Sequence, residues 1–216
     1  MGETACYLPG MTVTPDDIRR SVGLASAVLR QTAGNDWGVK AGGLDWDCWE
    51  TAEHLVDDLF SYAAQLASGR TDADVPLRYT QEAPGSPCNA VRVARKAGVE
   101  GLLTVLESAG GLLYAVAAAA PPRVRAHHVF GVSDPEGFVA MGVVETLVHT
   151  HDLATGLGIG EAWQPPAELC ARALARLFPD VAAGPPPWPA LLWATGRGEL
   201  SGVARRDTWR WYGEPR

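Results

Sequence analysis

The chain has 216 residues, of which 47% are hydrophobic and 20% are charged, as in an ordinary globular protein with one sizeable core. Its formal net charge of −7 argues against a nucleic-acid partner or an anionic membrane surface, since both favour a basic protein face. The first ten residues lack the basic and apolar regions of a signal peptide, and Pro121 and Pro122 stop the most apolar stretch, so we expect a cytoplasmic protein with no membrane span.

Two helices are expected in the first part of the chain. Thr14 is a favourable N-cap for the first helix, with Pro15 in the first turn, and the helix should end near Gly34. The second helix should follow Asp47 as its N-cap and end at Gly69. Both carry apolar residues at helical spacing, which predicts that each packs one face against a core.

A polar stretch rich in proline and glycine follows over residues 68–89 and predicts a long loop. A third helical region is expected over residues 90–120, and its glycines leave open whether it is broken. The fourth helix should begin at Ser133, whose spacing from Glu136 fits a capping box, and continue to about Gly156.

The sequence after residue 160 predicts a smaller C-terminal part that contains both helix and strand. A short amphipathic helix is expected over residues 167–178, and residues 191–200 and 207–213 look partly strand-like. The expected fold is therefore mainly α: a four-helix bundle over residues 10–160 with a small mixed α/β C-terminal extension over 161–216.

The fourth helix carries polar residues within an otherwise apolar sequence. At about 100° per residue, Glu145, His149 and Asp152 fall on one side, and no solvent face remains in the middle of the helix. A buried carboxylate and imidazole need partners. They could form a structural pair or line a partly solvated groove, or Glu145 and His149 could ligate a metal with His54 of the second helix as the third ligand. His54 could equally lie on a solvated face, whereas Asp152, one turn after His149, is placed to orient its imidazole.

The other histidines and the cysteines are weaker candidates for a metal site. His127 and His128 are expected to be loop residues, and His151 points to another side of its helix from His149. The cysteines lie far apart without a CxxC motif, which excludes a zinc ribbon or a thioredoxin-like motif. They are Cys6, Cys48, Cys88 and Cys170.

Two stretches, "DWDCWETAEHLVDDL" and "MGVVETLVHTHDLA", resemble the DinB-like helical-bundle superfamily, and most closely its mycothiol-dependent maleylpyruvate isomerase branch. The resemblance covers roughly residues 13–158. It implies that His54, Glu145 and His149 hold a divalent metal, most commonly Zn²⁺, with Ni²⁺ or Fe²⁺ as alternatives. Other DinB-like branches have three histidines, whereas the isomerase branch has glutamate at the middle position, as here.

The resemblance also implies a function. The isomerase branch has a larger C-terminal domain with an arginine that helps to hold substrate, and Arg197 and Arg210 are possible counterparts in this shorter C-terminal part. We expect a divalent-metal-dependent transferase or isomerase in which the metal activates mycothiol, a low-molecular-weight thiol, toward a small electrophile. Asp152 and Arg197 would assist catalysis, and the protein would be a monomer or homodimer.

Two alternatives remain open from the sequence. The same three ligands would serve metal-assisted hydrolysis, with water in place of the thiol. A non-catalytic bundle that binds a metal or a small ligand would also fit. No GxSxG, GxxxxGK[ST] or GxGxxG motif supports a serine hydrolase or a nucleotide-binding protein.

Overall fold

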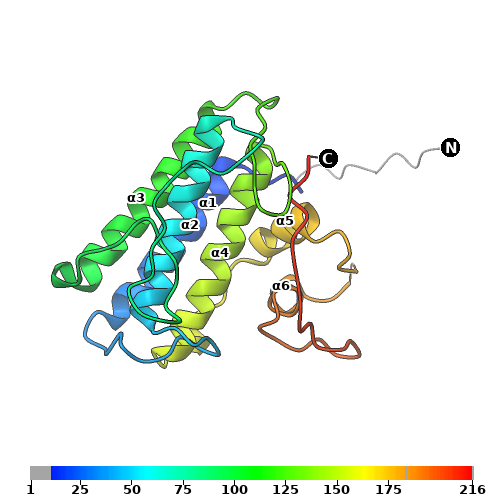
Figure 1. Ribbon diagram of the computed structural model, residues 1–216. Coiled ribbons are helices and arrows are strands. Elements are labelled where there is room, and N and C mark those ends of the chain that lie inside the picture. Colours follow the sequence, from blue (N-terminus) through cyan, green and yellow to red (C-terminus); the bar gives the residue numbers. More distant parts are fainter. Residues whose placement is uncertain (1–10, 183, 216) are drawn as a thin grey trace.

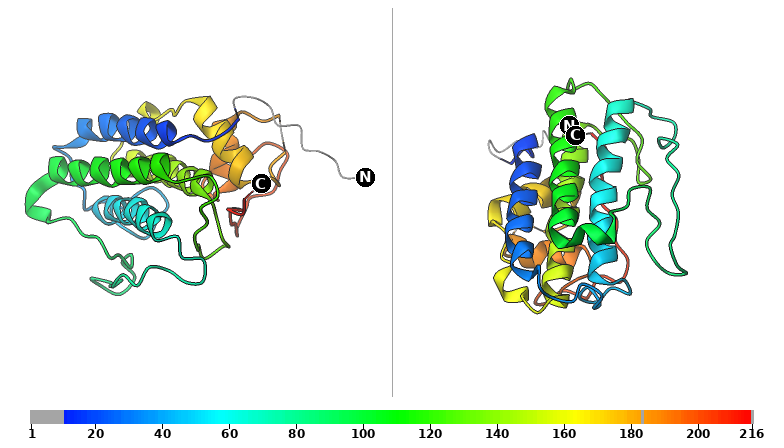
Figure 2. Two further views of the ribbon diagram at one scale, coloured as in Figure 1. Left: turned by 90° about the horizontal axis from the view of Figure 1, so that it is seen from above. Right: turned by 90° about the vertical axis from the view of Figure 1, so that its left-hand side faces the viewer.

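The computed structural model describes residues 11–182 and 184–215 and is mainly helical, as the sequence predicts (Figure 1). Its helices are α1 (Pro15–Leu29), η1 (Arg30–Thr32), α2 (Cys48–Ser68), η2 (Arg95–Ala97), α3 (Gly98–Ala119), α4 (Pro135–Gly156), η3 (Gly160–Ala162), α5 (Ala167–Leu177) and α6 (Pro187–Ala194). Helices α1 and α2 each pack against both α3 and α4, so the four long helices form a bundle (Figure 2). Helix α5 packs on α4, and α6 packs on α5.

Helix α4 is enclosed by its neighbours, which explains why its sequence has no solvent face. It contacts the three other long helices as well as α5. Close approach depends on Gly142, where a Cβ atom would lie 2.7 Å from a methyl carbon of Leu113 and 3.1 Å from one of Leu59. Polar side chains on this helix are therefore inside the protein, where each needs a partner.

The starts of α1 and α2 confirm the predicted caps. The backbone N–H of Thr14 donates to Asp17 at 2.9 Å. Asp47 accepts from the backbone N–H of Glu50 at 2.7 Å, and the Glu50 carboxylate accepts from the Asp47 N–H at 3.0 Å. Helix α2 ends at Gly69 with φ of +61°, a left-handed conformation that favours glycine.

The predicted cap of α4 was wrong by one residue. Asp134, rather than Ser133, is the N-cap, and its carboxylate accepts from the backbone N–H of Gly137 at 2.8 Å. The Ser133 hydroxyl instead donates to the backbone carbonyl of Gly213, far along the chain. Arg176 also donates to Asp134 at 2.8 Å, which holds the carboxylate at the helix end.

The third helix begins later than predicted. Residues 90–94 are not helical because the backbone N–H groups of Ala90 and Val91 donate to the Asp57 carboxylate of α2, at 2.8 and 2.7 Å. The helical region then begins with η2, and α3 follows from Gly98, whose φ is +64°. From there α3 is continuous to its end.

The predicted C-terminal strands were wrong, since the described residues contain only isolated β-bridges. Part of the first segment is helical, in α6. The second segment lies against the helices, where Tyr212 donates its backbone N–H to the Leu177 carbonyl at 2.8 Å. Trp211 is 3% exposed. Its β-prone aromatic side chain packs in the core instead of lying on a sheet.

Within residues 11–182 and 184–215, one helix meets the length and composition of a membrane span. Residues 95–119 have a mean hydropathy of 1.6 in their most apolar window. Core helices of bundles pass the same test, and Leu102, Leu103 and Leu113 on this helix are fully buried against the rest of the bundle. The expected absence of a membrane span stays a prediction.

Two sequence expectations concern residues that the structure does not describe. Residues 1–10, on which the expected absence of a signal peptide rests, lie outside the described residues, and so does Cys6. Cys48, Cys88 and Cys170 are free thiols.

Candidate metal centre

Four side chains of types that can ligate a metal, His54, Asp58, Glu145 and His149, converge between α2 and α4. Ligand atoms of His54, Asp58 and His149 all lie within 4.8 Å of one another. His54 and Asp58 are one turn apart on α2, and Glu145 and His149 are one turn apart on α4. The Asp58 Oδ2 atom lies 3.5 Å from Nε2 of His54, and the Glu145 Oε2 atom lies 3.2 Å from Nε2 of His149.

Both imidazoles are held through their Nδ1 atoms. Nδ1 of His149 lies 3.2 Å from the Asp152 carboxylate, and Nδ1 of His54 lies 3.2 Å from Oδ1 of Asn89. An acceptor at this position favours the tautomer that carries its proton on Nδ1. Nε2 of each ring then faces the space between the two helices. Nε2 of His149 lies 3.2 Å from the Glu145 carboxylate and carries a proton toward it when no metal is bound, and a bound metal would take the place of that proton.

Asn89 reaches His54 from the loop that follows α2. Reciprocal backbone hydrogen bonds of 3.1 Å join Asn89 to Thr80 and fix its place. The Trp46 ring packs edge-on against His54, with 4.8 Å between ring centroids. His54 is therefore oriented by a hydrogen bond on one side and by an aromatic ring on another.

Asp152 connects His149 to the C-terminal part of the chain. Its carboxylate accepts from Nε of Arg197 at 2.9 Å and from Nη2 at 2.8 Å, and Asp152 is only 3% exposed. Burial opposes the negative charge, but the His149 hydrogen bond and the Arg197 guanidinium outweigh it and hold the pKa of Asp152 below its ordinary value. The structure thus places Arg197 at the site, whereas Arg210 lies 3.5 Å from Glu214.

Burial keeps two members of the group uncharged when no cation is present. Burial, together with the nearby Glu145 carboxylate, raises the pKa of Asp58 well above its ordinary value. Burial and the neighbouring His149 lower the pKa of His54. Burial opposes protonation of His149 as well, but hydrogen bonds to Asp152 and Glu145 prevail and raise its pKa to about 9.

These residues fit a divalent metal. The Oδ2 atom of Asp58 is buried and has no hydrogen-bond partner, which is costly for a carboxylate oxygen unless a cation or another donor occupies the space beside it. Two imidazole nitrogens with carboxylate oxygens form a donor set that suits Zn²⁺, Ni²⁺ or Fe²⁺. A group that can hold a metal ion is therefore present, with Asp58 in addition to two of the expected ligands.

Glu145, the third expected ligand, is held next to this group. Its Oε1 atom accepts from the Tyr62 hydroxyl at 3.4 Å, while Oε2 faces His149. Its side chain is 13% exposed. Ligation by Glu145 stays a prediction, since the three residues whose ligand atoms all lie within 4.8 Å of one another are His54, Asp58 and His149.

Asp58 and Asn89 are parts of the site that were not predicted from the sequence. Asp58 carried a signal, because it lies one turn from His54 on the same side of α2, but that side was equally consistent with a solvated face. Asn89 carried none, since a loop residue's position depends on contacts that are distant in sequence.

The remaining histidines are not in the group, as expected. His127 lies 3.7 Å from the Asp74 carboxylate. His128 packs among aromatic rings, with 5.7 Å between its centroid and that of Trp211. His151 faces Trp188, with centroids 5.7 Å apart.

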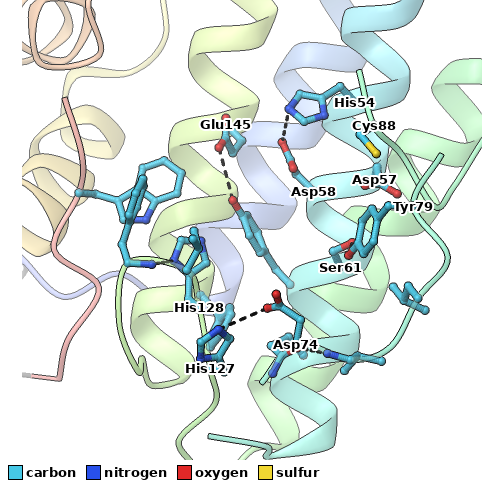
Figure 3. A pocket seen from close by; sticks show the side chains of 18 of the residues that line it. His54, Asp57, Asp58, Ser61, Asp74, Tyr79, Cys88, His127, His128 and Glu145 are labelled. Atoms are coloured by element: carbon cyan, nitrogen blue, oxygen red, sulfur yellow. Dashed lines mark hydrogen bonds and ion pairs between the residues drawn. The ribbon is translucent and has the colours of Figure 1, made fainter. Parts of the chain in front are cut away.

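Two cavities meet at the metal-ligating group. The first, of about 390 Å³, lies along α2, and Figure 3 shows His54, Asp58 and Glu145 at one end of it. The second, of about 550 Å³, lies toward the C-terminal segment and includes His149 and Arg197. Because His54, Glu145 and Trp209 line both, the group is accessible from two sides.

The fold and this site were compared with known proteins. No protein-family model, no curated protein and no solved structure matches the chain.

Proposed function

We propose that the protein is a DinB-like, divalent-metal-dependent enzyme that uses a low-molecular-weight thiol to isomerise a small electrophile or to transfer the thiol to it. The observation that carries the proposal is the orientation of His54 and His149. Each imidazole is bonded through Nδ1 to an oxygen, and each directs Nε2 to the same buried space. This is how histidine ligands are held in metal sites.

A divalent metal at this position would lower the pKa of a bound thiol, so that the thiolate, which is the nucleophile, is present near neutral pH. The protein would provide two approaches to it. The cavities on either side of His54 and Glu145 fit a reaction between two small molecules, with thiol and electrophile entering from different sides. The resemblance of α2 and α4 to the mycothiol-dependent maleylpyruvate isomerase branch is what suggests mycothiol as the thiol.

The chain's own residues would position the reactants and hold the site rigid. Asp152 and Arg197 fix the His149 ring, as Asn89 fixes His54. The Tyr62 hydroxyl donates to Glu145 and limits the rotation of its carboxylate. A site whose ligands are held in this way needs little rearrangement when it is filled.

The first experiment is the metal content of purified protein, measured by mass spectrometry for the wild type and for His149→Ala. His151→Ala is the matched control, because it removes an imidazole from the same helix but outside the group. We expect about one metal ion per chain in the wild type and the control, and a loss in His149→Ala. Absence of metal from the wild type, after reconstitution with Zn²⁺, Ni²⁺ and Fe²⁺, would leave Glu145 and His149 as a structural pair.

The second experiment separates the possible activities of metal-loaded protein. Turnover of maleylpyruvate or another small electrophile that requires mycothiol would support the proposal. Hydrolysis of an ester without any thiol would favour the metal-assisted hydrolase. Metal binding with neither activity would favour a non-catalytic binding bundle.

A further inference from the structure

The first cavity has a lining that the proposed chemistry does not explain. Its walls contain six aromatic side chains: Tyr62, Tyr79, Phe130, Phe138, Trp209 and Trp211. A reaction at the metal-ligating group would use only the end of this cavity at His54 and Glu145. Tyr62 and Trp209 reach that end, because Tyr62 donates to Glu145 and Trp209 lines both cavities, whereas Tyr79 lies beside Ser61 farther along the cavity (Figure 3).

The charged residues of this cavity are of one sign. Carboxylates of Asp57, Asp58, Asp74 and Glu145 line it, and no lysine or arginine is among its described lining residues. Asp58 and Glu145 belong to the metal-ligating end, and the Asp57 carboxylate is held by the backbone N–H groups of Ala90 and Val91, whereas Asp74 lies at the other end of the cavity (Figure 3). The carboxylate of the outer part is thus that of Asp74, which is 70% exposed and lies 3.7 Å from Nε2 of His127.

Two imidazoles besides His54 line the cavity: His127 lies next to Asp74, and His128 lies in the aromatic part. His128 accepts a hydrogen bond from the backbone N–H of Phe130 through its Nδ1 atom, at 3.1 Å. Burial lowers the pKa of His128 to about 4, so the ring is neutral near pH 7. The ring lies among Tyr62, Phe138 and Trp211, with centroid distances of 5.7 to 6.4 Å, and contributes a further ring to the wall.

We propose that this cavity binds a small organic cation that carries an alkylammonium group. Aromatic faces attract such a group through their quadrupole, and carboxylates in the same cleft add a field of the matching sign. The volume of about 390 Å³ is within the range of small-molecule sites. The proposal concerns the ligand of the cavity and holds whatever reaction occurs at the metal-ligating group.

Choline and its neutral isostere, 3,3-dimethylbutan-1-ol, are the probes that separate charge recognition from apolar binding. Binding is measured by titration calorimetry and by quenching of tryptophan fluorescence, since Trp209 and Trp211 line the cavity. We expect choline to bind at least about tenfold more tightly than the neutral alcohol. Equal affinities, or no binding of choline below about 10 mM, would overturn the proposal.

Two pairs of variants test the location. Asp74→Asn should weaken choline binding, whereas Asp72→Asn should not, because Asp72 is exposed, pairs with Arg70 and does not line the cavity. Tyr79→Leu should also weaken it, whereas Tyr79→Phe keeps the aromatic face and should retain it. If choline bound equally to wild type, Asp74→Asn and Tyr79→Leu, the site would be elsewhere and the proposal wrong. None of these residues is in the metal-ligating group, so a failure here leaves the metal-content result unaffected.

Discussion

Replacing Asp152 with asparagine should weaken both the fold and the metal site. Asp152 is buried, and its carboxylate bonds His149 on one side and Arg197 on the other. The amide keeps the size of the side chain but removes its charge, and one of its two polar atoms is no longer an acceptor. Either His149 or Arg197 then loses its acceptor.

The size of the effect follows from the burial of the pair. Removing one partner of a buried ion pair typically costs about 3–5 kcal/mol, because the other charge stays buried and unpaired. The side chain of Arg197 is 14% exposed, and its Nη1 atom still donates to the Thr195 carbonyl at 3.2 Å. We therefore expect the lower end of this range, about 3 kcal/mol of unfolding free energy. Loss of the Nδ1 acceptor of His149 should also weaken metal binding by about 10–100-fold.

A double-mutant cycle measures the pair directly. Urea denaturation with a chelator present gives the unfolding free energies of wild type, Asp152→Asn, Arg197→Met and the double variant, and competition with a chromogenic chelator gives metal affinity. Asp45→Asn is the control, because it breaks an exposed pair with Lys40 and should cost less than about 0.5 kcal/mol. We expect the double variant to lose at least about 1 kcal/mol less than the sum of the single losses. Additivity within about 0.5 kcal/mol, or unchanged metal affinity in Asp152→Asn, would refute the coupling.

Three further predictions concern acid, packing and metal. Burial lowers the pKa of His128 in the folded protein to about 4, whereas in the unfolded chain it is about 6.5. Between pH 6.5 and pH 4 the unfolded chain therefore binds a proton that the folded protein does not. The free energy of unfolding is unaffected by this residue above about pH 6.5 and should fall by up to about 3 kcal/mol toward pH 4. Urea denaturation between pH 6.5 and pH 4 should show a smaller loss of unfolding free energy for His128→Gln than for the wild type. The same pH dependence in both proteins would contradict the lowered pKa of His128. Gly156→Ala should cost about 1–3 kcal/mol, since the new Cβ would lie 2.2 Å from the Lys40 carbonyl oxygen, whereas Gly111→Ala has open space and should be neutral or stabilising by urea denaturation; equal effects would contradict the packing. Zn²⁺ at about 100 times its Kd should stabilise the wild type by about 2.7 kcal/mol in thermal unfolding, and an equal shift in His54→Ala would place the ion elsewhere.

The helices could be predicted where the deciding contacts are local. Asp47 and Glu50 form a cap within a single turn, so the start of α2 is determined by neighbouring residues. The start of α4 is not, because Ser133 and Asp134 are both good cap residues. The choice depends on Gly213, whose carbonyl takes the Ser133 hydroxyl from a distant part of the chain.

The C-terminal part could not be predicted for a related reason. Tryptophan and tyrosine favour strands because they pack well on a pleated, half-buried surface, so the preference applies only where the fold provides a sheet. In this chain Trp211 packs instead beside His128 and Phe130, which lie in the loop between α3 and α4. Composition alone does not distinguish these two surroundings.

The candidate site was predictable to the extent that helical spacing determines it. Glu145 and His149 are one turn apart and must share a side of α4, and His54 lies on the helix that packs against it. Asp58 follows from the same spacing once it is known which side of α2 faces α4. The Asn89 contact depends on a loop, and the sequence contains no periodic signal for it.

The C-terminal segment is part of the site and not an addition to a complete bundle. It supplies Arg197 to Asp152, and Trp209 lines both cavities. Leu177 of α5 and Trp211 belong to the same hydrophobic core cluster as the four long helices. A bundle that ended near residue 160 would keep every metal-ligating side chain but would lose the guanidinium that neutralises Asp152. The His149 ring would then be oriented by the buried Asp152 carboxylate without the Arg197 guanidinium that pairs with it. The geometry of the candidate metal centre therefore depends on residues that follow the bundle in sequence.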